Sequence, residues 1–394
     1  MRVAYVSPRP PEASGIADYA EHLARALEGA GVSVTTGLPS PLEAPDPAAV
    51  RRHARHLAAL PVDLYHFELG GGRVRHFLVL RELLALRPGR PVTATVHDPE
   101  RLAWRAWGLG RFEALPRPLQ QAATLAADPL SRRRERAVAH ALDRLVVLTE
   151  GGAEGLRRWM RLPPERIEVI PHGVAEVPHR EPPPAPPLRV LFFGFLYPGK
   201  GIEDLLDALD WVRRERPAQF PRLRLTLAGG SRPSMLLRGR GDYVAHLRAE
   251  IARRGLEERV DWALDLPEAE IPRLYQDHHL LALPYRDSRK IGLLGRFLGS
   301  SGALSWAIAC GRGALVSDAR ALAGEVARGN GAVFPQRDPA ALGARLAELA
   351  AAPETAFAWA AHAARLARER TWARVAGRFV QVFRSTLEKR GKAA

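Results

Sequence analysis

The chain has 394 residues, of which 46% are hydrophobic and 26% charged, so it is long enough for two domains and its composition excludes wholesale disorder. Cys310 is the single cysteine, which excludes a disulfide framework, and no apolar run is long enough to cross a bilayer. The formal net charge is +15, but the arginines are spread along the chain without a nucleic-acid-binding signature, so the charge favours an acidic substrate or a membrane surface over DNA.

The first half of the chain alternates short apolar runs with amphipathic segments. Met1 leads directly into a strand, which, with the cysteine usage, predicts a cytoplasmic protein; association with the inner face of the membrane is the open alternative. The predicted strands are 2–7, 32–35, 64–67, 92–96, 144–148 and 167–170, and the predicted helices are 16–30, 47–60, 75–86, 131–141 and 152–161. This alternation favours a doubly wound parallel sheet, whose ligand lies beyond the carboxyl ends of the strands.

Polar residues stand at these predicted strand ends. His97 ends the strand in TVHDPE, where an imidazole can hydrogen-bond a substrate hydroxyl or sense a phosphate; a structural histidine is the alternative. His66 and Glu68, in DLYHFELGGG, end a neighbouring strand and are expected to face the same crevice. Glu68 is either a ligand of an acceptor hydroxyl or an exposed loop carboxylate.

The segment 101–136 carries Trp104, Trp107 and Phe112 among many arginines. Aromatic residues with cations on an irregular segment suit an interfacial docking patch or a lid over an acceptor site. A partly buried helical excursion is the alternative, since tryptophan usually packs.

A polyproline-like stretch, PHREPPPAPP, separates two similar halves. The predicted domains are 1–178 and 188–372, joined by a linker at 179–187, with a helix at 373–390 returning to the first domain. In the second half the predicted strands are 188–193, 223–227, 260–263, 280–283, 314–317 and 331–334, and the predicted helices are 202–214, 243–254, 268–276, 303–310 and 339–389, the last broken at 368–372. We therefore predict two Rossmann-like α/β domains that face each other across a crevice.

Two turns in the second half are suited to an anion. The strand LRVLFF is followed by the glycine turn 194–201, which contains Lys200, and then by a helix, so free backbone N–H groups and an ammonium converge. Residues 299–302, Gly-Ser-Ser-Gly, open another helix. The alternatives are a solvated turn and simple helix capping.

The order of these features resembles a retaining GT-B glycosyltransferase of family 4 (glycosyl transferases group 1) over essentially the whole chain. The resemblance is carried by VAYVSPRPPEASGIADYAEHLARAL, TVHD, FFGFLYPGKGIEDLLDAL and SSGALSWAIACGRGALVSD. It implies the GT-B fold and transfer of a hexose from a nucleotide-diphosphate sugar, with UDP or GDP as the expected nucleotide, to an acceptor hydroxyl. It also implies retention of configuration, no metal and no cofactor.

The resemblance assigns roles to individual residues. His97 and Lys200 become the catalytic candidates, His97 on the donor sugar and Lys200 on the diphosphate. The residues expected to bind the donor diphosphate and sugar are Gly15, Gly194, Lys200, Ser300, Ser301 and Gly302, and the acceptor-side candidates are His66, Glu68 and Asp98.

The chain departs from the family pattern in ways typical of a divergent subgroup. Phe195 stands where the family usually has an arginine, and Leu298 and Trp306 stand where it has two glutamates spaced eight apart. The candidate substitute cations are Arg289, Lys290 and Arg296, on the loop 285–298.

These departures keep other functions open. A non-catalytic subunit that binds a nucleotide-sugar would explain the missing glutamates, and a GT-B-shaped sugar-nucleotide epimerase is a further alternative. An inverting enzyme would need a base, for which Asp18 and Glu68 are candidates. The acceptor can be a glycolipid, a polysaccharide or a small metabolite; no nucleic acid is expected.

Overall fold

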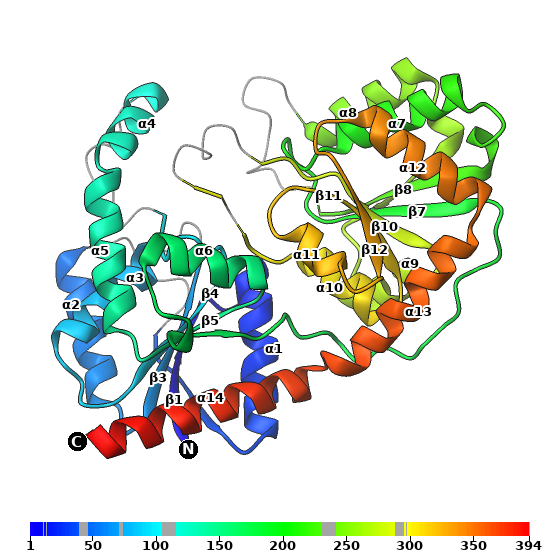
Figure 1. The fold of residues 1–394 in the computed structure, drawn as a ribbon. Helices are drawn as coiled ribbons and strands as arrows, with labels where there is room; N and C mark the ends of the chain where they lie inside the picture. Colours follow the sequence, from blue (N-terminus) through cyan, green and yellow to red (C-terminus); the bar gives the residue numbers. More distant parts are fainter. Residues whose placement is uncertain are drawn as a thin grey trace. The chain divides into compact units, whose positions relative to one another are not determined.

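The computed structural model describes residues 1–10, 12, 14–38, 46–70, 74–104, 116–230, 242–287, 295–296 and 298–393. The chain forms two compact units, each with its own core (Figure 1). The first comprises Met1–Gly173, Arg289–Ser300 and Trp372–Ala394, and the second comprises Val174–Ser288 and Ser301–Thr371.

The first unit is a six-stranded parallel sheet in the order β2-β1-β3-β4-β5-β6. Its strands are β1 (Arg2–Val6), β2 (Ser33–Thr36), β3 (Leu64–Leu69), β4 (Val92–Val96), β5 (Arg144–Val147) and β6 (Ile167–Val169). Its helices are α1 (Gly15–Gly29), α2 (Pro47–Ala59), α3 (Val74–Ala85), α4 (Arg117–Ala126), α5 (Asp128–Ala141), α6 (Glu150–Met160) and α14 (Trp372–Ala393). The strand order reverses between β1 and β3, and an open α/β sheet binds its ligand at such a point.

Strands β3 and β4 are buried along their whole length because helices cover both faces of the sheet. The two strands are neighbours, with Glu68 opposite Thr95 and Leu69 opposite Val96. The predicted adjacency of the two strand ends that carry Glu68 and His97 is therefore confirmed.

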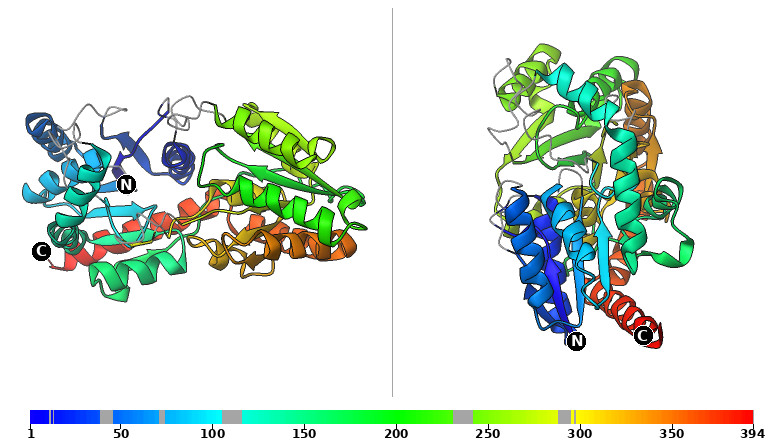
Figure 2. Two further views of the ribbon diagram at one scale, coloured as in Figure 1. Left: turned by 90° about the horizontal axis from the view of Figure 1, so that it is seen from above. Right: turned by 90° about the vertical axis from the view of Figure 1, so that its left-hand side faces the viewer.

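Helix α14 packs on the first unit although it ends the chain (Figures 1 and 2). Phe379 and Phe383 are fully buried in one cluster with Tyr5 of β1 and Leu23 of α1. The helix therefore completes the core on the α1 side of the sheet, as burial of two whole aromatic side chains on one helical face requires.

The second unit has the same kind of sheet, in the order β12-β11-β10-β7-β8-β9. Its strands are β7 (Leu188–Phe193), β8 (Leu223–Gly229), β9 (Val260–Leu264), β10 (Leu280–Leu283), β11 (Gly313–Ser317) and β12 (Gly331–Phe334). Its helices are α7 (Ile202–Glu215), α8 (Tyr243–Arg254), α9 (Ile271–Gln276), α10 (Gly302–Ala309), α11 (Leu322–Val326), α12 (Pro339–Ala351) and α13 (Glu354–Glu369), with short 3-10 helices at Phe220–Arg222, Glu257–Arg259 and Glu268–Glu270. The order reverses between β7 and β10, so the loops after these strands flank the expected ligand position.

The proline-rich stretch lies against the second unit instead of forming a separate linker. Arg312, whose side chain is buried, donates from Nη1 to the carbonyl oxygen of Arg180 (2.9 Å) and from Nη2 to that of Glu181 (3.2 Å). His279 Nε2 lies 2.9 Å from the carbonyl oxygen of Pro183. The chain passes between the units at Gly173–Val174, Ser288–Arg289, Ser300–Ser301 and Thr371–Trp372. The contacts that hold the proline-rich stretch on the second unit could not be predicted from its proline content.

Two further stretches differ from the sequence-based expectation. The described part of 101–136 contains α4 and α5, and Arg101 is fully buried between Asp128 and Glu135, so the alternative of a helical excursion holds there. Trp107 and Phe112 lie outside the described residues. The long C-terminal helical region is also broken at Ala352–Pro353, because proline cannot continue a helix.

Candidate functional site

His97 directly follows β4 at the carboxyl edge of the first sheet. Its backbone N–H donates to the carbonyl oxygen of Leu69 (2.8 Å), and its side chain is 9% exposed. The imidazole Nε2 lies 2.7 Å from Glu68 Oε2, and the Tyr19 ring meets the imidazole edge-on at 4.7 Å. The sequence-predicted histidine is thus held in one orientation, with Nδ1 as its remaining polar atom.

Glu68 is a fully buried carboxylate, which corrects both expectations for it. It is neither an exposed loop residue nor an open ligand of an acceptor hydroxyl, because Tyr5 donates to its Oε1 (2.6 Å) and His97 occupies Oε2. Burial raises the pKa of Glu68, but its interactions with His66, whose Nε2 lies 3.4 Å from Oε1, and with His97 outweigh burial and lower the pKa to about 2. Glu68 is therefore ionised at neutral pH and serves to orient His97.

His66 lies in the core and not at a substrate surface. Its Nδ1 lies 2.8 Å from Thr93 Oγ1 and its Nε2 lies 2.9 Å from Thr95 Oγ1, both on β4. The ring stacks on Tyr5, and no part of the side chain is exposed. A side chain in this environment does not contact an acceptor, so the expected role of His66 is corrected to a structural one.

Several loops of the first unit lie close to His97. A Cβ on Gly299 would lie 2.5 Å from the carbonyl oxygen of His97 and 2.9 Å from Asp98 Oδ1, and one on Gly70 would lie 2.3 Å from Ile16 Cδ1. A Cβ on Gly15 would meet nothing within 4 Å. The predicted residues Gly15, His97 and Asp98 therefore share one edge of the first sheet, with open space at Gly15.

The candidate substitute cation Arg296 also belongs to the first unit. Its backbone N–H donates to Glu100, and Thr149 donates to the carbonyl oxygen of Leu298 (3.2 Å). Arg296 is thus in a different unit from Lys200, with which it was expected to act. Arg289 and Lys290 lie outside the described residues.

Lys200 lies in the second unit, in the glycine turn between β7 and α7. Its Nζ is 3.8 Å from the centroid of the Tyr285 ring and 5.4 Å from that of Tyr197. Gly201 has a φ of 73°, and a Cβ there would lie 1.7 Å from the carbonyl oxygen of Pro284. Only glycine allows the turn to approach the strand end after β10 this closely, which brings Lys200 over Tyr285.

Tyr285 is the centre of this site, and the sequence did not single it out. Its side chain is buried beside Gly194, whose added Cβ would lie 3.7 Å from the phenol oxygen. Burial raises the pKa of Tyr285, but the charge and hydrogen bond of Lys200, the charge of Arg320 and a hydrogen bond with Ser301 outweigh it, and the pKa is lowered. The phenol thus lies in a strongly positive environment.

Helix α10 contributes its N-terminus to the same cluster. Ser301 is buried at the N-cap position, and a Cβ on Gly302 would meet nothing within 4 Å. Ser300 is half-buried beside it, at the end of the stretch that groups with the first unit. The predicted Gly194, Lys200, Ser301 and Gly302 are thus brought together, as an anion site at a helix N-terminus requires.

Arg320 is a second cation at Tyr285 that the sequence analysis missed. Its Cζ lies 5.2 Å from the centroid of the Tyr285 ring, and the residue has a φ of 55°. It follows β11 by three residues, and the strand-end rule could have identified it had it been applied to that strand.

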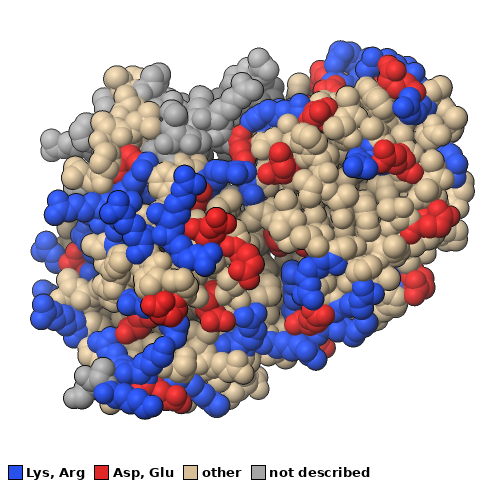
Figure 3. Space-filling model, viewed as in Figure 1, with Lys and Arg blue, Asp and Glu red and all other residues tan. Residues whose placement is uncertain are grey.

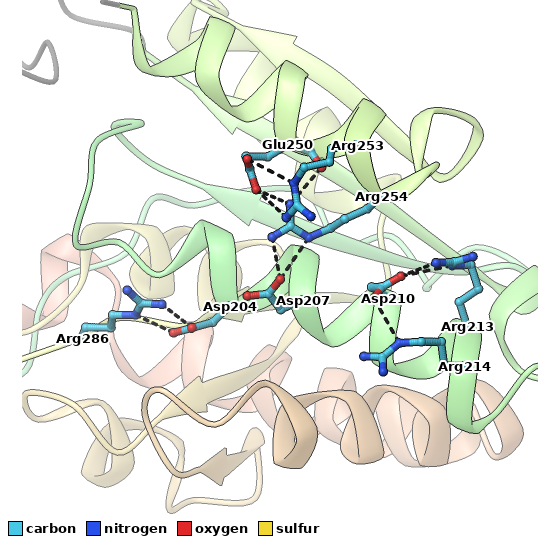
Figure 4. Close-up of polar contacts among 9 residues, drawn as sticks. All are labelled: Asp204, Asp207, Asp210, Arg213, Arg214, Glu250, Arg253, Arg254 and Arg286. Carbon is cyan, nitrogen blue, oxygen red and sulfur yellow. Dashed lines mark hydrogen bonds and ion pairs between the residues drawn. The ribbon is translucent and has the colours of Figure 1, made fainter. Parts of the chain in front are cut away.

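Several other cations of the second unit pair with carboxylates (Figure 4). Arg286, next to Tyr285, donates from Nε to Asp204 Oδ2 (2.6 Å), and Arg254 donates from Nη2 to Asp207 Oδ1 (2.6 Å). Within the described ranges, neither Lys200 nor Arg320 forms an ion pair with a carboxylate. In the same part of the chain, no group of three or more His, Cys, Asp and Glu side chains is arranged to hold a metal ion.

The first unit also carries a basic face, formed by α3, α5 and α6 (Figure 3). On this face the pKa of Arg136 is lowered by burial and then by nearby positive charge, that of Arg161 first. Beside them, the α4–α5 region exposes Leu119 (54%), Leu125 (40%) and Leu130 (54%). None of the helices in the described part of the chain combines the length and apolar character that a bilayer crossing needs.

Both halves of the chain match glycosyltransferase families. Residues 13–176 match Glycosyltransferase Family 4, and residues 187–352 match Glycosyl transferases group 1. The D-inositol 3-phosphate glycosyltransferase of Thermobispora bispora is 29% identical over 266 residues, which are 65% of this chain and 59% of that protein. The match therefore spans less than two thirds of this relative's length.

Solved structures share the fold over nearly the whole chain. The sucrose-phosphate synthase of Thermosynechococcus elongatus superposes with a TM-score of 0.68 at 18% identity, covering 99% of this chain and 100% of that one. Anabaena HepE in complex with UDP superposes with a TM-score of 0.67 at 18% identity, covering 98% and 100%. The two family matches fall on the two α/β units, and the chain belongs to the group 1, family 4 glycosyltransferases of the GT-B fold.

Proposed function

We propose that this protein transfers a hexose from a nucleotide-diphosphate sugar to an acceptor hydroxyl, with retention of configuration and without a metal. The observation that carries the proposal is Lys200, a cation with no carboxylate partner among the described residues, in a glycine turn beside the N-terminus of α10. A diphosphate has the charge that this arrangement favours. The family membership supplies the reaction class, and the inositol-phosphate glycosyltransferase relative supports it.

In the second unit, the proposed role of Lys200 is to stabilise the leaving group. The bond between the anomeric carbon and the diphosphate oxygen breaks, and negative charge builds up on the phosphate. An ammonium and a helix N-terminus that are already in place stabilise that charge without reorganisation, which lowers the barrier to departure. Ser301 and the backbone at Gly302 would add hydrogen bonds to the same oxygens.

In the first unit, His97 is the proposed contact for a hydroxyl of the donor sugar. Glu68 holds Nε2, so Nδ1 is the nitrogen left for a ligand. The fixed ring restricts the orientation of the bound sugar, which is how a positioning contact contributes to rate. Gly15 and Asp98 lie at the same sheet edge and are proposed to line the site there.

We propose a retaining, metal-independent reaction because it requires neither a protein base nor a metal ion. In the proposed mechanism the acceptor hydroxyl attacks the face that the phosphate leaves, and its proton passes to the departing phosphate oxygen. No protein base is then required, and neither Asp18 nor Glu68 has to act as one. Lys200 supplies positive charge that a metal ion would otherwise supply.

We propose UDP as the first nucleotide to test, with GDP as the alternative. Support comes from solved relatives, since HepE was crystallised with UDP and with UDP-glucose. The acceptor class stays open among glycolipids, polysaccharides and small metabolites.

We also propose that the basic face and the exposed leucines of the α4–α5 region bring the protein to an anionic membrane surface. Leu119, Leu125 and Leu130 would enter the interface while the arginines of α5 and α6 attract anionic headgroups. Co-sedimentation with phosphatidylglycerol vesicles, but not with phosphatidylcholine vesicles, is expected. No binding to either would contradict this part of the proposal.

A second candidate function is a non-catalytic subunit that binds a nucleotide-sugar. Leu298 and Trp306 favour it, since they stand where the family usually has glutamates. One experiment separates the two functions: incubation of the protein with UDP-hexoses and a panel of acceptor hydroxyls, with release of UDP and glycoside formation both measured. Stoichiometric release and transfer support the transferase, whereas tight UDP-hexose binding without either product supports the subunit.

A further inference from the structure

We propose that Arg320 is the second cation of the diphosphate site and takes the place of the arginine that Phe195 has displaced. This inference rests on the proposed function and deepens it, since it adds a specificity-determining residue to the same site. The substitute cation was expected on the loop that precedes α10. Arg289 and Lys290 of that loop lie outside the described residues, and the inference rests on the loop that follows β11.

Lys200 and Arg320 lie at the same aromatic ring. Lys200 Nζ and Arg320 Cζ lie 3.8 Å and 5.2 Å from the centroid of the same Tyr285 ring. They come from the loops after β7 and β11, and Tyr285 follows β10, the strand between them in the sheet. Three neighbouring strand ends therefore place two cations about one buried phenol at the carboxyl edge of the second sheet.

Lys200 and Arg320 differ from the neighbouring Arg286 in how their charge is balanced. Arg286, one residue from Tyr285, is matched by Asp204, whereas the described residues provide no carboxylate for the side chains of Lys200 and Arg320. Tyr285 has a lowered pKa because both cations act on it. A bound phosphate would supply the anion that both cations lack, and a guanidinium can hold two phosphate oxygens at once.

The backbone of Arg320 has an unusual conformation. Arg320 has a φ of 55°, a conformation that a residue with a long side chain rarely adopts. Its N–H donates to Asp287 Oδ1 (3.2 Å), and Asp287 is itself held by Gln336, whose Oε1 accepts from the Asp287 N–H at 2.7 Å. The surrounding loop thus imposes a conformation in which Arg320 faces Tyr285, and such strain is found preferentially at ligand sites.

The test compares binding of UDP, GDP and ADP by calorimetry to the wild type and to Arg320→Gln, Lys200→Gln and the control Arg345→Gln. Arg345 is an exposed arginine of α12 in the same unit and pairs with Glu348, so its variant removes one charge away from the site. For the diphosphate that the wild type binds most tightly, Arg320→Gln is expected to weaken affinity about tenfold or more, as Lys200→Gln does. The control and the affinity for the corresponding nucleoside are expected to stay unchanged.

A glycine variant separates ligand binding from folding. Arg320→Gly removes the cation and relieves the backbone, so its unfolding temperature is expected to equal or exceed that of the wild type while diphosphate affinity falls as in Arg320→Gln. Arg87→Gly is the matched control, since Arg87 also has a positive φ (48°) but follows α3 in the first unit. It is expected to bind the diphosphate like the wild type.

Two results would overturn the inference in distinguishable ways. Wild-type affinity in both Arg320 variants, with weakened binding in Lys200→Gln, would show that Arg320 only packs on Tyr285, and the proposed function would stand. Failure of the wild type to bind any of the three diphosphates would remove the proposed function and the role of Arg320 with it.

Discussion

The imidazole Nε2 of His97 lies 2.7 Å from Oε2 of Glu68, a carboxylate that is completely buried beneath the edge of the first sheet. The two residues come from neighbouring parallel strands and lie 29 positions apart. Tyr5, on the neighbouring strand β1, donates to the other carboxylate oxygen. Glu68 and Tyr5 therefore hold the His97 ring from the core of the unit and not from an exposed loop.

Glu68→Gln is expected to lower kcat about tenfold to a hundredfold, which corresponds to the loss of one charge-assisted hydrogen bond. The amide keeps the shape of the side chain but removes the charge that holds the His97 N–H. Affinity for UDP is expected to stay unchanged, because Glu68 belongs to the first unit and Lys200 to the second. Steady-state kinetics with calorimetry check both, and equal losses in kcat and UDP affinity would mean that Glu68 only supports folding.

Glu68 is also expected to make stability depend on acid pH. Its pKa is lowered from 4.5 to about 2 in the folded protein, so its contribution is present above pH 4.5 and is lost as the pH falls towards 2. The size is on the order of 3 kcal/mol. The free energy of unfolding measured in urea should fall more steeply for the wild type than for Glu68→Gln as the pH decreases across this range. Parallel pH profiles for the two proteins would contradict the ionised, hydrogen-bonded carboxylate.

Gly201→Ala is expected to disrupt the turn that carries Lys200. An added Cβ would lie 1.7 Å from the carbonyl oxygen of Pro284, and the residue has a φ of 73°. Gly199→Ala is the matched control, since Gly199 also has a positive φ (102°) but open space around the added atom. Chemical denaturation should show a cost of about 1 kcal/mol for Gly199→Ala and several times more for Gly201→Ala. Similar costs for both would mean that the backbones do not touch.

Arg312→Met is expected to free the proline-rich stretch from the second unit. The buried guanidinium donates to carbonyl oxygens of Arg180, Glu181, Gln276 and His278, among others. Its removal leaves buried carbonyls without donors, at a cost of about 1–3 kcal/mol for each that water cannot reach. Limited proteolysis should then cut within 178–187 in the variant and spare the wild type. Cleavage at the same rate in both proteins would show that the stretch is not held by Arg312.

Much of the fold could be predicted from the sequence because both sheets are parallel. Strands β4, β7, β10 and β12 have the predicted bounds. Strand β10, which is buried along its whole length, appears as a continuous apolar run. Helix α4 lies in the segment 101–136, for which the sequence left a helical excursion open as an alternative without giving its bounds. The break at Ala352–Pro353 was passed over although proline there marks it.

The sequence indicated candidate site residues only where they belong to a recognisable motif. Lys200 and His97 were proposed as site residues from the glycine turn and the strand-end motif, and the structure brings Lys200 together with Gly194 and Ser301. The burial of His66 and Glu68 was not predictable, because it depends on which face of β3 is covered by α14, a helix more than 300 residues later. Tyr285 and Arg320 were missed since their significance comes from their proximity to Lys200, not from the residues that flank them.

The most direct test of the account is calorimetric binding of UDP, GDP and ADP to the wild type and to Lys200→Gln, without added metal. The account predicts that one diphosphate binds the wild type and that the variant binds it about tenfold to a hundredfold more weakly, while the corresponding nucleoside binds both proteins equally. Equal diphosphate affinity in the two proteins would contradict the assignment of Lys200 and, with it, the diphosphate site of the second unit.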